Sequence, residues 1–377
     1  MIPSIYIYYV KAVHNDNTGL STTKPNLNIS YYYDQTSQYT MKKKPHIYII
    51  YTGGTIGMKK TPQGYEPESG FLGAFIQNLP EFFHEDMPHF TLFEHNPLID
   101  SSNMSPYQWH DIAYIIQNNY KKYDGFVVLH GTDTMAYTAS ALSFMLENLS
   151  KPVIVTGSQI PLSQLRSDGQ QNLLNSLYVA AHYPIHEVCL FFNNKLFRGN
   201  RTTKVCADSF NAFSSPNYPA LLESGIQIKV HTGIVSAPLQ KKLKVQPIQT
   251  QSISMLNLYP GIQPELLEHV LNQPIQALIL LTFGAGNAPQ DPQMLEQFKK
   301  ATDRGMIIVN LSQCMQGSVN MNSYATGQTL QKAGMISGFD MTKEAALTKL
   351  HYLLSKELSH KEVRRMFCLP MKGEMTL

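Results

Sequence analysis

Small hydroxyl side chains and one carboxylate follow directly after an apolar run in the middle of the chain. The run Phe126-Val127-Val128-Leu129 is typical of a strand buried inside a parallel sheet, and His130-Gly131-Thr132-Asp133-Thr134 comes next. A threonine hydroxyl is a weak nucleophile at neutral pH and needs a base or a polarising neighbour. Lys204 supplies one if the fold brings it beside Asp133, because the carboxylate then orients the lysine and the lysine accepts a proton through a threonine.

A second turn of this kind follows the first apolar run, His46 to Tyr51. In Thr52-Gly53-Gly54-Thr55-Ile56-Gly57 the paired glycines allow a tight turn and close approach to a ligand. The pattern fits neither common nucleotide-binding loop, and alone it is more often structural than catalytic. Backbone N–H groups in such turns can stabilise an oxyanion. Combined with Thr132, the turn suits acyl transfer from an amide to water, which needs no histidine, metal or cofactor.

Three other polar segments each allow a structural and a functional interpretation. Met58 to Gly73, which contains Tyr65, is either a surface loop or a mobile lid. Asp100-Ser101-Ser102 either caps a helix or binds a ligand. Arg198-Gly199-Asn200-Arg201-Thr202-Thr203-Lys204 is either a solvated loop or an anion site. Composition alone favours the structural interpretation of each segment.

Strand and helix patterns alternate along the chain and predict an α/β fold with two domains and largely parallel sheets. Further strands are predicted over residues 152–156, 188–192, 276–281 and 306–311, and helices from near Pro106, from Gly169 and over 293–302. The spacing of Leu142, Met145, Leu146 and Leu149 predicts one apolar helical stripe, with Thr134 as its cap. Leu347, Leu350, His351 and Leu354 lie at helical spacing, and His351 is predicted to be a packed core histidine.

The predicted organisation is an irregular extension over residues 1–44, a larger catalytic domain over 45–230, a linker over 231–250 and a smaller domain over 251–377. The extension is rich in Asn, Thr, Ser and Tyr, and Met41 is an alternative start to Met1.

Composition narrows the class of protein. The formal charge of +3 is spread thinly and no basic stripe is visible, so no nucleic-acid partner is expected. No stretch approaches the 18 or so apolar residues of a membrane span, and Ile5 to Val10 is not expected to be a signal peptide because no basic segment precedes it. The four cysteines are far apart and form no CxxC pair, so neither a zinc site nor a disulfide framework is expected. A reducing cytoplasm fits best.

Three segments, Tyr51–Gly57, Leu129–Thr138 and Arg198–Lys204, resemble in order the signature segments of bacterial type I (cytosolic) L-asparaginases. The resemblance extends from about His46 to the C-terminus. It implies hydrolysis of L-asparagine to L-aspartate and ammonia, a two-domain fold, and assembly as a homodimer or a homotetramer built as a dimer of dimers.

The resemblance also implies residue roles. Thr55 corresponds to the primary nucleophile, with Tyr65 on the lid beside it. Thr132, Asp133 and Lys204 correspond to a second catalytic cluster. Substrate binding is expected from the following residues: Asp100, Ser101, Ser102, Thr132 and Asp133. Either threonine could form the acyl-enzyme.

Members of this family can bind asparagine at a second, regulatory site, to which the following residues correspond: Thr203, Asn287, Ser312 and Cys314. Leu281 stands where enterobacterial relatives have an arginine, and the loss of a guanidinium removes a bidentate carboxylate partner. We therefore expect no allosteric activation. The structural alternative for Cys314 is that of a packing residue.

Two other functions are compatible with this pattern. One is the amidase subunit of a tRNA-dependent amidotransferase, against which the short extension argues, because that subunit carries an extra N-terminal domain. The other is an amino-acid sensor that binds without turnover. Retention of both threonines, the aspartate and the lysine argues against the sensor.

Overall fold

The computed structural model describes residues 43–231, 241–322 and 325–377. The predicted extension up to residue 42, which includes the alternative start at Met41, lies outside the described residues. So does the segment 232–240 of the predicted linker. The predicted domain boundaries stay predictions.

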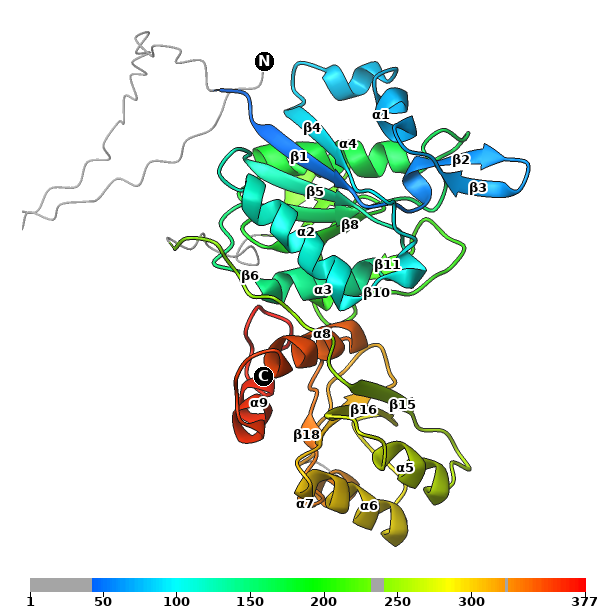
Figure 1. The fold of residues 1–377 in the computed structure, drawn as a ribbon, viewed down its shortest axis with the longest axis vertical. Coiled ribbons are helices and arrows are strands. Elements are labelled where there is room, and N and C mark those ends of the chain that lie inside the picture. The colour runs from blue at the N-terminus through cyan, green and yellow to red at the C-terminus, as the bar shows by residue number, and fades with distance from the viewer. Residues whose placement is uncertain (1–42, 232–240, 323–324) are drawn as a thin grey trace, which may run out of the picture. The chain divides into compact units, whose positions relative to one another are not determined.

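A largely parallel sheet forms the N-terminal lobe (Figure 1). Its described strands lie across the sheet in this order: β4 (His89–Glu94), β1 (His46–Tyr51), β5 (Gly125–Leu129), β7 (Val153–Thr156), β8 (Val188–Phe192), β9 (Lys195–Arg198), β12 (Leu222–Ser224) and β13 (Ile228–Val230). Neighbours from β4 to β8 are parallel, and those from β8 to β13 are antiparallel. The strands predicted for this lobe are confirmed.

Alternating residues of the central strands enter two separate cores, as the period of two of a strand requires. Ile47 and Ile49 of β1 face one core, which α4 (Gly169–His182), α1 (Phe71–Ile76) and the short η2 (Pro80–Phe83) cover. The intervening Tyr48 and Ile50 face the other core, which contains the apolar residues of α2 (Pro106–Asn119) and α3 (Met135–Met145). The sheet is thus buried on both faces, which explains its continuous apolar runs.

The predicted helical stripe that ends at Leu149 is wrong in its second half. α3 ends at Met145, and Leu146 begins β6 (Leu146–Glu147), which pairs with β14 (Lys244–Val245). The reason is that α3 lies against the sheet, α8 (Lys343–Leu354) and the short η4 (Gly199–Arg201) at once, so nearly all of its residues are buried. A helix buried all round has no single apolar face from which its end can be predicted.

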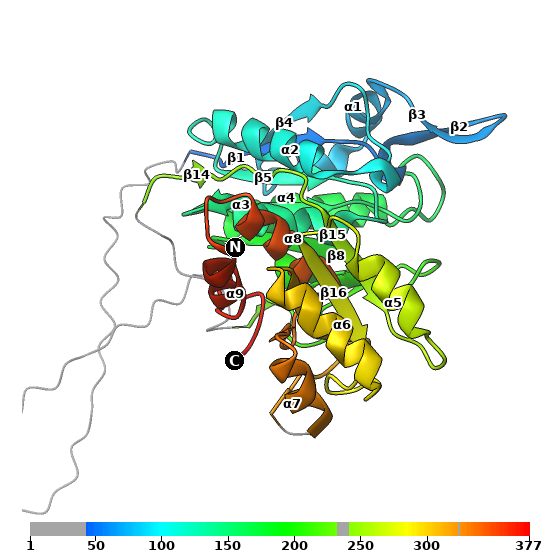
Figure 2. The same cartoon turned by 60° about the horizontal axis from the view of Figure 1, so that its bottom comes forward.

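A second, parallel sheet forms the smaller C-terminal lobe, seen from another side in Figure 2. Its described strands are β15 (Ile253–Asn257), β16 (Ala277–Thr282), β17 (Ile307–Ser312) and β18 (Ile336–Ser337). α5 (Pro264–Leu271), α6 (Pro292–Asp303) and α7 (Ala325–Lys332) contribute to the core on one face. α8 (Lys343–Leu354) and α9 (His360–Phe367) contribute to the core on the other.

α8 connects the two lobes, because it packs both on α3 of the larger lobe and on β15 and β16 of the smaller one. The core on this side therefore runs without a break from β1 and β5 to β16 and β17. The predicted fold class, two α/β domains with the larger one first, is confirmed. Within the described residues, no helix is both long and apolar enough to cross a bilayer.

Candidate active site

The loops after β1 and β5 lie against each other at the carboxyl edge of the sheet. The two strands are parallel neighbours whose last residues are paired. A Cβ atom on Gly54 would lie 2.4 Å from the backbone nitrogen of Gly131, so the loops are in backbone contact. Gly54 also has a φ of +89°, which side chains disfavour. The next residues, Thr55 and Thr132, therefore share this edge, where ligands bind in open α/β sheets.

Thr132, Asp133 and Lys204 form one hydrogen-bonded cluster. Lys204 lies on β10 (Thr203–Lys204), which pairs with β11 (Phe213–Ser214). Its Nζ donates to Thr132 Oγ1 at 3.0 Å and to Asp133 Oδ1 at 2.7 Å. The Asp133 side chain is 63% exposed and that of Lys204 only 21%. The carboxylate thus holds a largely buried ammonium group against one threonine hydroxyl.

Gln159 fixes the direction of the Thr132 hydroxyl. Its amide Nε2 donates to the carbonyl oxygens of Ala207 and Ser209, both at 3.1 Å. This orientation turns Oε1 toward Thr132, whose hydroxyl donates to it at 3.1 Å. The Thr132 oxygen is left to accept from Lys204. Gln159 was not among the residues predicted for the site; its position after β7, next to β5 in the sheet, was the available signal.

His130 is a buried structural residue. Its Nδ1 donates to the carbonyl of Gly131, because a carbonyl can only accept, so Nε2 is the acceptor. Thr138 donates to that Nε2 at 2.8 Å and itself accepts from the indole of Trp109 at 3.1 Å. Burial lowers the pKa of His130 from 6.5 to about 4. A neutral imidazole with both nitrogens occupied braces the loop.

The Asp100-Ser101-Ser102 segment adjoins the same loop. It contains η3 (Ser101–Asn103), and Asp100 Oδ1 accepts the N–H of Ser102 at 3.0 Å, as a capping residue does. Ser101 is buried, and a Cβ on Gly131 would lie 2.4 Å from its Oγ. Asp100 and Ser102 are exposed. The capping interpretation thus holds for Asp100, while Ser101 packs against the turn that carries Thr132.

Thr134 begins α3 as predicted, but its hydroxyl does not cap the helix. Thr134 occupies the position before α3 without a side-chain bond to the helix N–H groups. Its Oγ1 instead donates to the carbonyl of Ser101 at 2.7 Å. The bond ties η3 to the loop after β5, which is a positional role that the local sequence does not reveal.

Thr55 and Tyr65 lie on nearby elements that are separated by one strand. Thr55 begins η1 (Thr55–Gly57), is partly exposed, and forms no side-chain hydrogen bond within the described residues. The polar segment after it is an exposed hairpin of β2 (Met58–Thr61) and β3 (Gly64–Pro67). Tyr65 on β3 is 47% exposed, and β3 contacts η1. The hairpin gives this segment more regular structure than a loop.

The expectation that the segment from Arg198 to Thr203 is a solvated loop is wrong. It contains η4 (Gly199–Arg201), and its side chains from Asn200 to Thr203 are almost completely buried. Burial of two arginines is tolerated because each is paired, Arg198 with Glu187 and Arg201 with Asp340. Neither partner is a neighbour in the sequence, so composition could not predict this.

Three of the four residues predicted for a regulatory site lie together in the C-terminal lobe. Ser312 Oγ donates to the carbonyl of Gly284 at 2.6 Å and accepts the N–H of Cys314 at 3.0 Å. Asn287 Oδ1 accepts from Thr326 at 2.5 Å. Cys314 is exposed and free.

The fourth predicted regulatory residue, Thr203, uses its hydroxyl differently. Its Oγ1 donates to Glu344 Oε1 at 2.8 Å in a buried contact between the lobes. Leu281 lies on β16 and is partly buried. The regulatory assignment stays a prediction.

Two family models match the chain in order. Residues 46–236 match "Asparaginase, N-terminal" and residues 252–367 match "Glutaminase/Asparaginase C-terminal domain". A two-lobed α/β fold with threonines, a lysine and a carboxylate at one strand edge agrees with these matches. The chain belongs to the asparaginase family.

Named relatives agree with this assignment. The chain is 57% identical to L-asparaginase 1 of Escherichia coli strain K12 over 89% of its own length and 99% of that protein. The crystal structure of L-asparaginase I from Vibrio cholerae matches with a TM-score of 0.84 and 59% identity, covering 89% of this chain and all of that one. The thermostable L-asparaginase of Thermococcus kodakarensis matches with a TM-score of 0.79 and 31% identity, over 88% and 99% of the two chains.

Proposed function

We propose that this chain is an L-asparaginase, which hydrolyses L-asparagine to L-aspartate and ammonia. The observation that carries the proposal is the contact of Lys204 with both Thr132 and Asp133 at the edge that also holds Thr55. High identity over nearly the full length of L-asparaginase 1 supports the same conclusion.

In the first step, the Thr55 oxygen attacks the side-chain amide carbon of asparagine. The Thr55 hydroxyl proton passes to the amide nitrogen as the C–N bond breaks, so the nitrogen departs as ammonia. The product on the enzyme is an aspartyl ester of Thr55. Thr55 suits this role because its hydroxyl is partly exposed and forms no hydrogen bond within the described residues. Backbone N–H groups of the glycine-rich turns are suited to stabilise the oxyanion.

In the second step, water attacks the ester carbon and releases aspartate, and the Thr55 oxygen regains its proton. When Lys204 is neutral, the Thr132 hydroxyl turns from Gln159 to Lys204 Nζ, gives its proton to that amine and takes one from the attacking water. Asp133 keeps the lysine in place through its 2.7 Å contact. Tyr65 on the exposed hairpin covers Thr55 when substrate is present.

For substrate binding we propose Asp100, Ser101, Ser102, Thr132 and Asp133. The carboxylates suit the α-amino group of asparagine, and the hydroxyls and backbone N–H groups suit its α-carboxylate. Contact of Ser101 with the Gly131 turn supports a shared pocket. Metal ions and organic cofactors are not required by this chemistry.

Ammonia release from asparagine by the purified protein tests the proposal. We expect turnover by the native chain and loss of turnover in the Lys204→Met variant. Binding of asparagine without ammonia release would instead identify an amino-acid sensor. If the protein neither binds asparagine nor releases ammonia from it, the proposal is refuted.

We also propose that asparagine is preferred over glutamine. The two amides differ by one methylene, and discrimination over one methylene is typically worth about 1–3 kcal/mol, or roughly 10- to 150-fold in the specificity constant. Equal specificity constants for the two amides would contradict this.

A cytoplasmic location and assembly as a homodimer or homotetramer are further proposals. The four cysteines are free, which suits a reducing compartment. Light scattering on the purified protein measures the assembly, and a monomer would contradict the proposal.

A further inference from the structure

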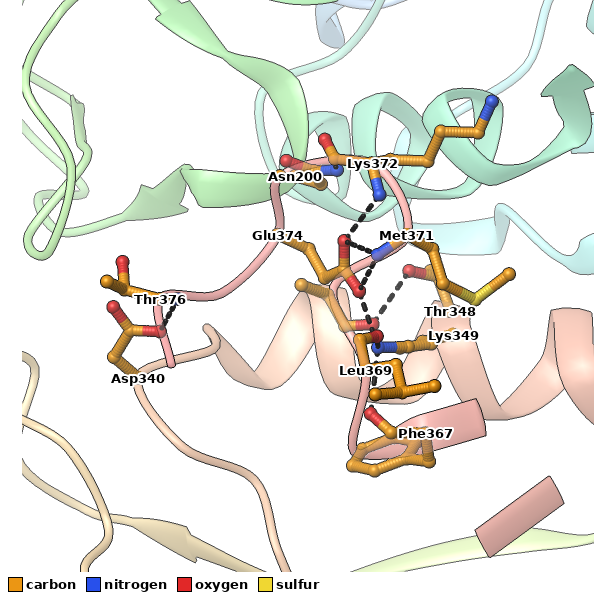
Figure 3. A network of polar contacts seen from close by, with 12 residues as sticks. Asn200, Asp340, Thr348, Lys349, Phe367, Leu369, Met371, Lys372, Glu374 and Thr376 are labelled. Carbon is orange, nitrogen blue, oxygen red and sulfur yellow. Dashed lines mark hydrogen bonds and ion pairs between the residues drawn. The ribbon is translucent and has the colours of Figure 1, made fainter. Parts of the chain in front are cut away.

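The last residues of the chain form a turn around one buried carboxylate. Glu374 accepts the backbone N–H groups of Met371 and Lys372 and forms an ion pair with Lys349 of α8 (Figure 3). Lys349 Nζ also donates to two backbone carbonyls just before the turn, at 2.8 and 2.7 Å. Both charged side chains are completely buried. The C-terminal turn, residues 371–376, is therefore fixed to α8.

Arg201 of η4 joins this C-terminal turn to the larger lobe. Its Nε donates to the carbonyl of Gly373 at 2.7 Å, and its two terminal nitrogens donate to Asp340 Oδ2 at 2.8 Å and Thr376 Oγ1 at 2.9 Å. The other Asp340 oxygen accepts the N–H of Thr376 at 2.8 Å (Figure 3). Arg201 is only 2% exposed. The planar guanidinium fork thus fixes η4 to three separate points of the smaller lobe.

The chain between Arg201 and Lys204 has little freedom to move. The Thr202 hydroxyl donates to the carbonyl of Arg198 at 2.8 Å, and Thr203 bonds Glu344 at 2.8 Å. Neighbouring side chains on a strand point to opposite faces, so Lys204 points away from Thr203 and reaches the catalytic cluster. Residues 201–204 are therefore held as one short unit, so the position of Lys204 depends on the contacts of Arg201 as well as on those of Thr202 and Thr203.

We propose that Arg201 is a positioning residue, which uses Asp340 and the C-terminal turn to place the Lys204 ammonium group against Thr132. The expected effect on kcat rests on the proposed function. The expected position of Lys204 does not, because it can be measured in a protein without turnover. The hydrogen bonds of Arg201 within the described residues go to Gly373, Asp340 and Thr376 and not to the catalytic cluster. Arg201 acts only through the path of the backbone that leads to Lys204.

A graded series of variants tests the proposal. Arg201→Lys keeps a positive charge but loses the fork, and Asp340→Asn keeps the shape but loses the charge partner. Thr376→Val removes one acceptor at an exposed position, so this variant is expected to fold. Arg364→Ala is the matched control, because Arg364 also donates to a backbone carbonyl of the smaller lobe, that of Gly334, without touching η4.

The expected kinetic result is a loss of kcat with little change in KM. Small misplacement of a catalytic group can cost about 100-fold, so we expect Arg201→Lys to lower kcat by roughly 10- to 100-fold. Asp340→Asn is expected to lower kcat less, and Thr376→Val least. Arg364→Ala keeps native kcat. Adding Lys204→Met to Arg201→Lys is expected to give no loss beyond that of Lys204→Met alone, because both act through one group.

Two kinetic results would overturn the proposal. One is a native kcat in Arg201→Lys and Asp340→Asn. The other is a kcat of the double variant, Arg201→Lys with Lys204→Met, that falls by the product of the two single losses. That result would show that Arg201 acts independently of Lys204. A crystal structure of Arg201→Lys separates this inference from the proposed function. We expect Lys204 Nζ to lie beyond hydrogen-bonding distance of Thr132 Oγ1, whether or not the native protein hydrolyses asparagine, and an unmoved Lys204 would refute the inference.

Discussion

Both sheets of this protein present polar side chains at the carboxyl ends of parallel strands, but the two edges are built differently. In the smaller lobe, Ser312 is the last residue of β17, and its hydroxyl both donates to Gly284 and accepts from Cys314. In the larger lobe, the Thr55 hydroxyl forms no bond within the described residues, and Thr132 lies against an ammonium group. A strand edge becomes chemically useful when one hydroxyl is left free to attack and a second lies beside an amine that, once neutral, accepts a proton.

The largest expected effect separates these two kinds of hydroxyl. Thr55→Ala and Thr132→Val are each expected to reduce ammonia release by about 10³-fold or more, because groups that act as a catalytic unit fail together. Both proteins should keep the native circular dichroism spectrum. Near-native turnover in either variant would show that its threonine is not catalytic.

Ser312→Ala is the matched control for these two variants. It also deletes a strand-end hydroxyl, but one that only satisfies neighbouring backbone groups. We expect turnover within about twofold of native and a stability cost of about 1 kcal/mol for the lost hydrogen bond. A loss of turnover comparable with that of Thr132→Val would remove the distinction between the two edges.

Each region also contains one buried, neutral histidine, and both should weaken the fold in acid. Burial lowers the pKa of His130 and of His351 from 6.5 to about 4. Between these values the unfolded chain binds a proton that the native chain does not, so stability falls as pH falls from 6.5 to about 4. The loss is up to about 3 kcal/mol for each histidine.

Urea unfolding of the native protein and of His351→Gln measures this effect. His351 packs against Trp109 and accepts the N–H of Gln251. It is far along the chain from the residues of the catalytic cluster. The variant is expected to lose less stability than the native protein between neutral pH and pH 4. An identical pH dependence in the two proteins would show that His351 is not held neutral.

A smaller effect is expected from Gln159→Leu. The substitution removes the acceptor that holds the Thr132 hydroxyl, so that hydroxyl loses its fixed direction while Lys204 stays in place. We expect kcat to fall by about tenfold, in line with the roughly 1–1.5 kcal/mol of one neutral hydrogen bond. An unchanged kcat would show that the Lys204 contact alone orients the hydroxyl.

The smallest effect is expected at the predicted regulatory residues. With Leu281 in place of an arginine, velocity is expected to rise hyperbolically with asparagine concentration, and Asn287→Ala is expected to leave that curve unchanged. A sigmoidal curve that Asn287→Ala makes hyperbolic would contradict the expected absence of allosteric activation.

The central strands and the two glycine turns could be predicted from the sequence because their signals are local. Runs such as Val188 to Phe192 are apolar on both faces, and paired glycines mark turns. The contact of Lys204 with Asp133 could only be stated as a condition, because 71 residues separate them. The resemblance to a family, rather than any spacing, joined the two segments in advance.

Other features depend on contacts that no local pattern encodes. Arg201 is buried because Asp340 lies beside it, 139 residues later in the chain. The end of α3 could not be predicted because that helix is buried on nearly every side. Thr134 bonds Ser101 rather than its own helix, because η3 happens to lie within reach. Charged or hydroxyl residues in a turn therefore predict a polar segment, but they do not predict which residue each side chain bonds.

The most direct test of the account is to identify the residue that carries the acyl group during turnover. The enzyme is mixed with asparagine, quenched rapidly in acid, digested and mapped by mass spectrometry. We predict an aspartyl group on the peptide that contains Thr55, and none in Thr55→Ala. Two results would contradict the assignment of Thr55 as the attacking group. One is an aspartyl group on Thr132, and the other is hydrolysis of asparagine without any acylated peptide.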